Sequence, residues 1–157
     1  MEYDFKILRL SQKFIDDYPK NKYRELMLKD KRPYSCLLID THKDYFICIP
    51  FRSSIQHNNA YIFKNTNRSK RTRSGLDYSK VVLIKDTAYF DSSGVVVDND
   101  EYKAVVTNIE HIIKQITCYI DTYVNHINGA KTLHIREFER KYKFSTLPYF
   151  HNILNLS

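Results

Sequence analysis

The chain has 157 residues, of which 43% are hydrophobic, so it can bury a core of its own and is not a disordered chain. It has only three glycines and four prolines, and no repeat or change of composition, so we expect a single domain over residues 1–157. The formal net charge of +7 favours a nucleic acid or an anionic membrane as partner, although it also suits a role in solubility alone.

The cysteines indicate the compartment. Cys36, Cys48 and Cys118 lie in apolar runs without the spacing of a zinc site, which predicts three buried free thiols in a reducing cytoplasm. The N-terminal residues are too charged for a signal peptide, and no apolar run approaches the roughly 20 residues of a membrane span. We therefore expect a cytoplasmic protein with no metal, no cofactor and no membrane partner.

The N-terminal half is predicted to contain short strands. Residues 3–10 alternate as in a strand, and Ser11 is a candidate N-cap for a short helix. The basic segment 20–32 is predicted to be a loop or a short helix. The apolar, β-branched and aromatic runs 34–39 and 45–51 are joined by a polar turn, which predicts a hairpin of two buried strands.

Two more strands are predicted at residues 60–63 and 80–85, on either side of an arginine-rich loop. Several short strands at close spacing indicate a small, strongly curved antiparallel sheet or barrel.

The C-terminal half is predicted to be helical. Asp98 to Asp100 supply N-cap candidates, apolar residues follow helical spacing to Ile127, and Gly129 provides a stop, which predicts one long amphipathic helix packed on the sheet. A second, basic helix is predicted at residues 133–142, and Ser145 is a candidate cap for a short last helix. The expected fold class is α+β.

Side chains suited to phosphate chemistry follow the strand 45–51. RNA cleavage without a metal needs a base for the 2′-hydroxyl, an acid for the leaving 5′-oxygen and cationic donors for the phosphate. Histidine titrates near neutrality, arginine donates two parallel hydrogen bonds, and serine can orient a hydroxyl. We therefore predict Arg52, Ser53 and His57 as catalytic residues. The alternative is an ordinary polar turn.

The loop 65–80 has five basic residues against one aspartate, with hydroxyl side chains between them, and it suits a phosphate backbone. The alternative is a solvated basic loop. Basic and aromatic residues before the strand 34–39 could line the same cleft or form a solvated face. The residues predicted to bind RNA are Lys31, Arg32, Tyr34, Ser54, Lys64, Arg68, Ser69, Lys70, Arg71, Arg73, Ser74, Tyr78 and Lys80.

Two motifs in the first 85 residues resemble those of a known family. Pro50-Phe51-Arg52-Ser53 closes a strand, and Gly-Leu-Asp-Tyr-Ser-Lys at residues 75–80 precedes another. Both resemble elements of the toxins of type III toxin–antitoxin systems, the ToxN/AbiQ superfamily, and are closer to the CptN/TenpN branch than to ToxN. The C-terminal helix agrees with that family in position and type only.

The resemblance implies a curved sheet of the MazF/Kid kind and a metal-independent endoribonuclease that leaves a 2′,3′-cyclic phosphate. It also implies a role in phage defence, cellular RNA substrates, and a small pseudoknot-forming antitoxin RNA repeat that closes with the toxin into a heteromer. Ser53 matches the family's active-site serine, and Arg52 stands where ToxN relatives have a hydroxyl residue. His57 lies near a lysine of those relatives, and Lys31 or Arg32 near another.

Two other functions stay open at the level of sequence, because the chain contains no strict catalytic triad. One is a non-catalytic RNA-binding module that uses the same basic loop. The other is a toxin that poisons gyrase, since such toxins share the curved-sheet fold.

Overall fold

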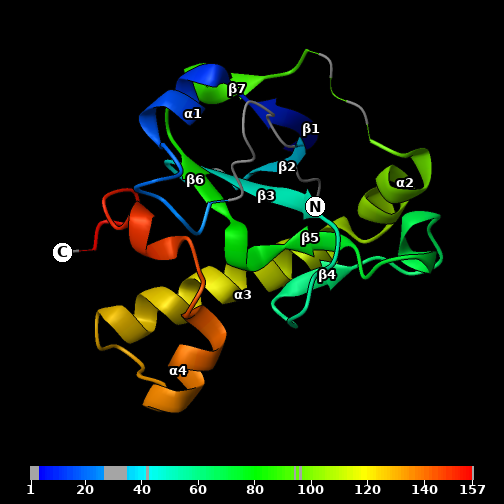
Figure 1. Ribbon diagram of the computed structural model, residues 1–157. Coiled ribbons are helices and arrows are strands. Elements are labelled where there is room, and N and C mark those ends of the chain that lie inside the picture. The colour runs from blue at the N-terminus through cyan, green and yellow to red at the C-terminus, as the bar shows by residue number, and fades with distance from the viewer. Residues whose placement is uncertain (1–3, 27–34, 42, 94, 96, 157) are drawn as a thin grey trace.

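A computed structural model of the chain describes residues 4–26, 35–41, 43–93, 95 and 97–156 (Figure 1). These residues form an α+β fold, as predicted. The strands are β1 (Asp4–Leu10), β2 (Ser35–Asp40), β3 (Phe46–Arg52), β4 (Ala60–Ile62), β5 (Gly75–Asp77), β6 (Val82–Ile84) and β7 (Phe90–Asp91). The helices are α1 (Gln12–Asp17), α2 (Asn99–Thr107), α3 (Ile109–Ile127) and α4 (Ile135–Tyr142), with 3-10 turns η1 (Arg68–Lys70), η2 (Tyr78–Lys80), η3 (Thr87–Tyr89) and η4 (Leu147–Phe150).

The seven strands form one antiparallel sheet in the order β4-β5-β3-β2-β1-β7, and β6 also pairs with β3. One edge of β3 therefore serves two partners: its first half pairs with β6, and its last residues, Phe51 and Arg52, pair with Leu76 and Gly75 of β5. The turn η2 lies between these two partners in sequence. Among the described residues β4 and β7 do not pair, so the sheet is open and a closed barrel is not formed.

The predicted strands β1, β2, β3, β4 and β6 are confirmed, as is the short helix after Ser11. β5 was missed, because three residues inside a basic loop are too few to show an alternating pattern. Its first residue, Gly75, is required by a close approach: a Cβ there would lie 1.9 Å from the carbonyl oxygen of Tyr61 on β4.

The prediction of one long C-terminal helix is wrong, because the chain breaks into α2 and α3 at Asn108. Asn108 has φ −113° and ψ 18°, outside the helical range, and its side-chain amide donates to the carbonyl of Ala104 at 2.8 Å. This asparagine therefore ends α2. The apolar spacing continues on both sides of the break, which is why periodicity alone did not reveal it.

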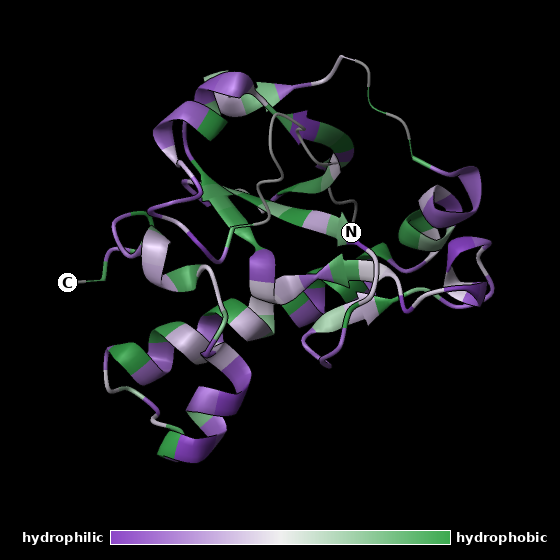
Figure 2. Ribbon diagram, viewed as in Figure 1, coloured by the Kyte–Doolittle hydropathy of each residue, from purple (hydrophilic) through white to green (hydrophobic). Residues whose placement is uncertain are grey.

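The core lies between the sheet and α3. Ile112, Ile116 and Ile120 of α3 are buried against strand residues such as Ile49 and Leu83. Burying each such side chain contributes on the order of 2 kcal/mol. Figure 2 shows this pattern as apolar strands and an apolar stripe on α3, whereas α4 is mostly hydrophilic.

The thiols correct one prediction. Cys36 and Cys48 are buried in β2 and β3, and burial raises the pKa of both thiols. Cys118 on α3 is exposed, contrary to the expectation of three buried thiols. Of the helices that the structure describes, none has the length and apolar content to cross a membrane.

Candidate active-site cleft

Two of the predicted catalytic residues meet at a buried carboxylate. Arg52 ends β3, His57 follows in the turn, and Asp77 ends the neighbouring strand β5. An Arg52 Nη1 donates to Asp77 Oδ2 at 2.7 Å, and His57 Nε2 lies 3.2 Å from the same oxygen. The Asp77 side chain has no exposed surface, whereas those of Arg52 and His57 are about one-third exposed. The buried Asp77 carboxylate therefore orients the guanidinium of Arg52 and the imidazole of His57, which both reach the surface.

Ser79 completes the hydrogen bonding of Asp77. Its backbone N–H and its hydroxyl both donate to Asp77 Oδ1, at 2.9 and 2.6 Å. Burial by itself would raise the pKa of Asp77, but the hydrogen bonds from His57, Ser79 and Arg52 outweigh burial and lower it. Asp77 is therefore an anion at neutral pH.

The hydrogen bonds of His57 assign its tautomer. The backbone N–H of Asn59 donates to Nδ1 at 3.0 Å, so this nitrogen carries the lone pair. Nε2 faces the Asp77 carboxylate and lies 3.3 Å from Ser79 Oγ, so in the neutral ring the proton resides on Nε2. The arrangement is that of a histidine oriented by a carboxylate, with Nδ1 as the basic atom.

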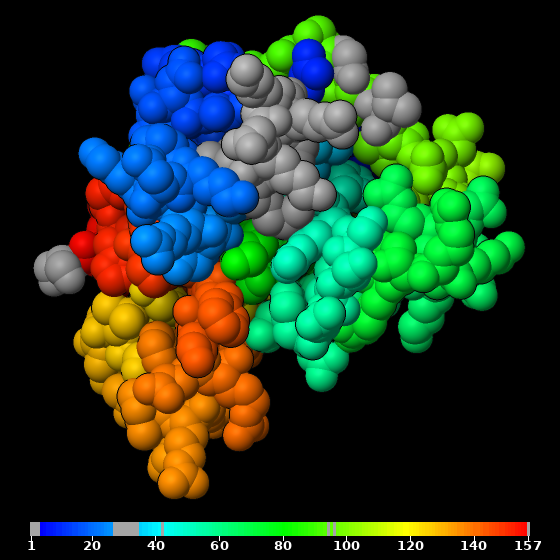
Figure 3. Space-filling view, in the orientation of Figure 1, coloured from blue at the N-terminus to red at the C-terminus, as the bar shows by residue number. Residues whose placement is uncertain are grey.

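Arg52 and His57 line a cleft of about 550 Å³. Lys80 and the exposed ring of Phe144 complete its rim, and Lys80 Nζ donates to the carbonyl of Phe144 at 2.9 Å. Burial lowers the pKa of Lys80, although the Asp77 charge acts in the opposite direction. Figure 3 shows the green segment around η2 at the bottom of a hollow between the cyan turn after β3 and the orange C-terminal segment.

Of the two adjacent serines after Arg52, it is Ser54 and not Ser53 that lines the cleft, together with Ser79. Ser53 is exposed and is not among the cleft-lining residues, so its predicted catalytic role stays a prediction. Ser54 has φ 56°, a left-handed conformation that is uncommon for serine. It is held there by Thr72 Oγ1, which accepts from the Ser54 N–H at 2.8 Å and lies 3.1 Å from Ser54 Oγ.

The basic loop divides into structural and exposed residues. Arg68 pairs with Asp98 and Glu101 at 3.7 and 3.8 Å, which ties the loop to α2. Arg73 donates to the carbonyl groups of Ile55 and His57 and to Asn58 Oδ1, so it clamps the turn that carries His57. The basic side chains left exposed and without an ion pair to a described residue are Lys64, Lys70 and Arg71.

Three residues predicted to contact RNA are buried or hydrogen-bonded within the protein. Tyr78 is buried and donates its hydroxyl to Gln115 Oε1 at 2.7 Å. Ser74 is also buried, so neither side chain reaches the surface of the described structure, and the RNA contacts of these two residues stay a prediction. The Ser69 hydroxyl donates to the carbonyl of Thr66 within the loop. Three other predicted contacts, Lys31, Arg32 and Tyr34, lie outside the described residues.

Sequence reasoning missed Asp77 and Ser79 as members of the site. Asp77 is the only acidic residue of the loop 65–80, and it stands two residues before a serine in the motif at residues 75–80. An isolated carboxylate in a basic segment was the available signal, because such a group must find cationic partners when it is buried. Among the described residues, no cluster of His, Cys, Asp or Glu has the arrangement of a metal site.

No protein-family model, curated protein or solved structure matches this chain.

Proposed function

We propose that the protein is a metal-independent endoribonuclease, and that its catalytic centre is the cleft of Arg52, His57 and Lys80. The observation that carries this proposal is the convergence of Arg52 and His57 on the buried Asp77. A carboxylate that orients a histidine next to an arginine at an open cleft supplies a base and an anion-binding group together. The open antiparallel sheet, in which β3 pairs with both β5 and β6 on one side, is compatible with the MazF/Kid fold that the motifs imply.

In the proposed reaction the 2′-oxygen attacks the adjacent phosphorus, and the bond from phosphorus to the 5′-oxygen breaks. The 2′-hydroxyl proton goes to a base, the leaving 5′-oxygen receives a proton from an acid, and a 2′,3′-cyclic phosphate remains. Arg52 stabilises the charge that gathers on the non-bridging oxygens, because its guanidinium is fixed by Asp77 and faces the cleft.

Two residues suit the proton transfers. His57 has its lone pair on Nδ1, and a substrate hydroxyl that displaces the Asn59 N–H would find a base there. Lys80 is a cation in the same cleft. Burial lowers its pKa, which makes its ammonium group a stronger proton donor. We therefore assign His57 as the base and Lys80 as the acid of the proposed reaction.

The biological role that we propose follows from the motifs at residues 50–53 and 75–80. They support a toxin of a type III toxin–antitoxin system that processes a repetitive RNA and is held inactive by the pseudoknot repeats in a closed heteromer. Arg52 and Lys80, one residue from each motif, lie in the same cleft. This is the relation expected of motifs that share one function.

A second candidate, a non-catalytic RNA-binding module, is favoured by one observation. Both ring nitrogens of His57 already have hydrogen-bond partners, Asn59 and Asp77. In a binding module these bonds would simply hold the turn, and His57 would exchange no proton.

The test is to incubate the full chain with unstructured and structured RNA in EDTA and to analyse the new ends. The variants are His57→Gln, Ser53→Ala and Ser54→Ala. Cleavage to 2′,3′-cyclic phosphate that persists in EDTA and is lost in His57→Gln supports the endoribonuclease. The serine pair decides between the residue that the motif indicates and the residue that lines the cleft. Intact RNA that binds tightly would move the assignment to the binding module, and intact RNA with damaged DNA in expressing cells would move it to a gyrase poison.

A further inference from the structure

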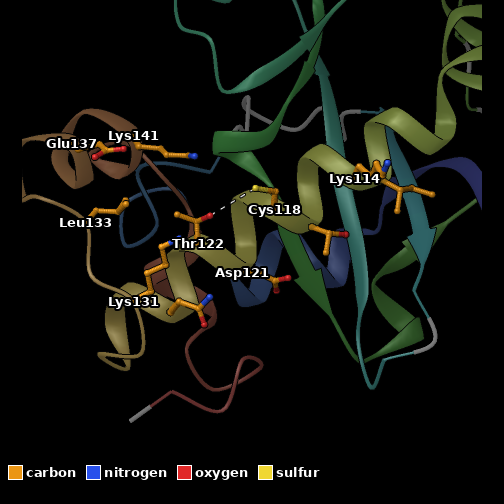
Figure 4. Close-up of a pocket in the computed structure, with 11 residues that line it drawn as sticks. Lys114, Cys118, Asp121, Thr122, Lys131, Leu133, Glu137 and Lys141 are labelled. Atoms are coloured by element: carbon orange, nitrogen blue, oxygen red, sulfur yellow. Dashed lines mark hydrogen bonds between the residues drawn. The ribbon is translucent and has the colours of Figure 1, made fainter.

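Two further hollows along α4 are linked to the cleft through shared lining residues. The cleft shares His57 with a hollow of about 340 Å³, which α4 lines through Glu137, Arg140 and Lys141. That hollow shares Glu137 and Lys141 with a larger one of about 740 Å³ between α3 and α4. Figure 4 shows the larger hollow, with Glu137 and Lys141 on α4 and Lys114 farther along α3. We call the three together the α4 groove.

The α4 groove is cationic. Among the described residues, the basic side chains that line it are Arg52, Lys80, Lys114, Lys131, Arg140 and Lys141, against the carboxylates of Asp121 and Glu137. Within the described part of the chain, the four basic residues beyond the cleft form no ion pair. Their charges are therefore available to a ligand, unlike those of Arg68 and Arg73 in the basic loop.

The wall of the groove is preformed. Phe138 of α4 stacks on His126 of α3 with ring centroids 3.9 Å apart, and the Tyr142 hydroxyl donates to the carbonyl of Tyr119 at 2.7 Å. Asn59 Nδ2 donates to the carbonyl of Lys141 at 3.2 Å, which joins the catalytic turn to the end of α4. A groove held in this way needs little reordering before it binds.

We propose that the α4 groove holds a single strand of RNA that continues from the cleft across His57 and along α4. This inference rests on the proposed function and names the route of its substrate. Lysine and arginine side chains spaced along a groove suit successive phosphates, and the exposed Phe144 ring at the rim suits base stacking. Cores of protein–protein interfaces are depleted in charged residues, so a charged lining favours a polyanion over a protein.

The test removes three groove charges away from the cleft and measures binding apart from cleavage. The full chain carrying Lys114→Ala, Lys131→Ala and Arg140→Ala is compared with Lys6→Ala, Lys43→Ala and Lys103→Ala, which are equally exposed and lie outside the groove. The probe is a fluorescent single-stranded 2′-O-methyl RNA, which has no free 2′-hydroxyl to attack. Urea midpoints check that both triple variants fold.

We expect the groove variant to bind at least about tenfold more weakly, and its slope of log K against log salt to be smaller by about 2. The matched control should keep the affinity and slope of the unmodified chain. Equal losses in both variants, or no loss in the groove variant, would overturn the inference. So would equally tight, groove-dependent binding of a polyglutamate peptide, since it would indicate an acidic protein partner. If RNA binding depends on the groove but ordinary RNA is not cleaved, the groove proposal stands and the nuclease proposal is refuted. If ordinary RNA is cleaved but binding does not depend on the groove, the nuclease proposal stands and the groove proposal is refuted.

Discussion

The turn after β3 and the basic loop before β5 are both polar, and in sequence the loop is the more conspicuous of the two. In the structure Arg52, at the end of β3, and His57, in the turn, line a cleft above one buried carboxylate. The loop directs Arg68 to the carboxylates of α2 and Arg73 to the carbonyl groups of the turn itself. Two of the loop's arginines thus hold the protein backbone and neighbouring elements in place, whereas residues at the end of β3 and in the turn line the cleft.

The number of arginines in a segment therefore does not decide whether they bind a ligand. The acceptors around each guanidinium decide it, and they come from other elements. Arg73 finds the carbonyl of Ile55 at 3.0 Å, whereas Arg71, two residues away, is exposed without an ion pair to a described residue.

The largest effect on stability is expected at Gly75, where β5 packs closely against the backbone of β4. Gly75→Ala places a Cβ 1.9 Å from the carbonyl oxygen of Tyr61, so β4 and β5 must separate. We expect a loss of at least about 3 kcal/mol in unfolding free energy, measured in urea. Gly129→Ala is the control, because its φ is +80° but no atom lies within 4 Å of the new Cβ. That change should cost only about 1 kcal/mol.

Asp77→Asn should have the next largest effect, because it weakens the acceptor shared by Arg52, His57 and Ser79. We expect the unfolding free energy to fall by about 2 kcal/mol. We also expect RNA cleavage to be lost. The control is Asp44→Asn, an exposed partner of Lys85, which should cost less than about 1 kcal/mol. Equal costs at the two sites would refute the organising role of Asp77.

The lowered pKa of Asp77 predicts that the unfolding free energy decreases at acid pH. The folded protein lowers the pKa of Asp77 below its ordinary value of 3.8, so the unfolded chain binds the proton more readily. The stabilisation is complete above pH 3.8 and is lost as the pH falls through the lower pKa of the folded state. Unfolding free energy measured against pH should show this loss in the unmodified chain, and a shallower one in Asp77→Asn.

Arg73→Ala should have a moderate effect on stability. It distinguishes a structural role of Arg73, in holding the turn, from a role in binding RNA. Loss of its hydrogen bonds to the turn should lower stability by about 1 kcal/mol and slow cleavage by releasing His57. The salt slope of RNA binding should not change. Arg71→Ala is the matched control, with an expected cost below about 0.5 kcal/mol. A slope smaller by about 0.7 in Arg73→Ala, with stability unchanged, would make Arg73 a phosphate ligand instead.

Arg68→Ala is expected to have the smallest effect. Its pairs with Asp98 and Glu101 are long and partly exposed, so their loss should cost less than about 1 kcal/mol in a thermal or urea measurement. Burial raises the pKa of Glu101 and Arg68 opposes that rise, so the variant should raise it further. Lys70→Ala provides the comparison, and an equal response of the Glu101 pKa there would show that the Arg68 pair has no specific role.

Local patterns predicted the parts of the fold that depend on neighbouring residues. The hairpin of β2 and β3 was predictable because both strands are apolar runs around a polar turn. The break at Asn108 was not, since it changes the φ and ψ angles of one residue without disturbing the apolar spacing. β5 was missed because its pairing with Arg52 of β3 and Tyr61 of β4 depends on residues far from it in the chain.

The site divides in the same way. Arg52 and His57 were predictable from their chemistry at a strand end, where side chains leave the core. Asp77 was not, because its role depends on the register that places Arg52 opposite Gly75 across the sheet. The burial of Ser74 and Tyr78 likewise depends on the packing of the whole sheet against α3.

The most direct test of the account is the single-turnover rate of RNA cleavage in EDTA for two variants of the full chain. One is Arg52→Lys in the cleft, and the other is the double variant Lys70→Ala and Arg71→Ala in the exposed part of the loop. We expect a rate about 100-fold lower for Arg52→Lys, because lysine lacks the planar fork that binds phosphate, and a nearly unchanged rate for the loop variant. A nearly unchanged rate in Arg52→Lys, with a large loss in the loop variant, would contradict this expectation.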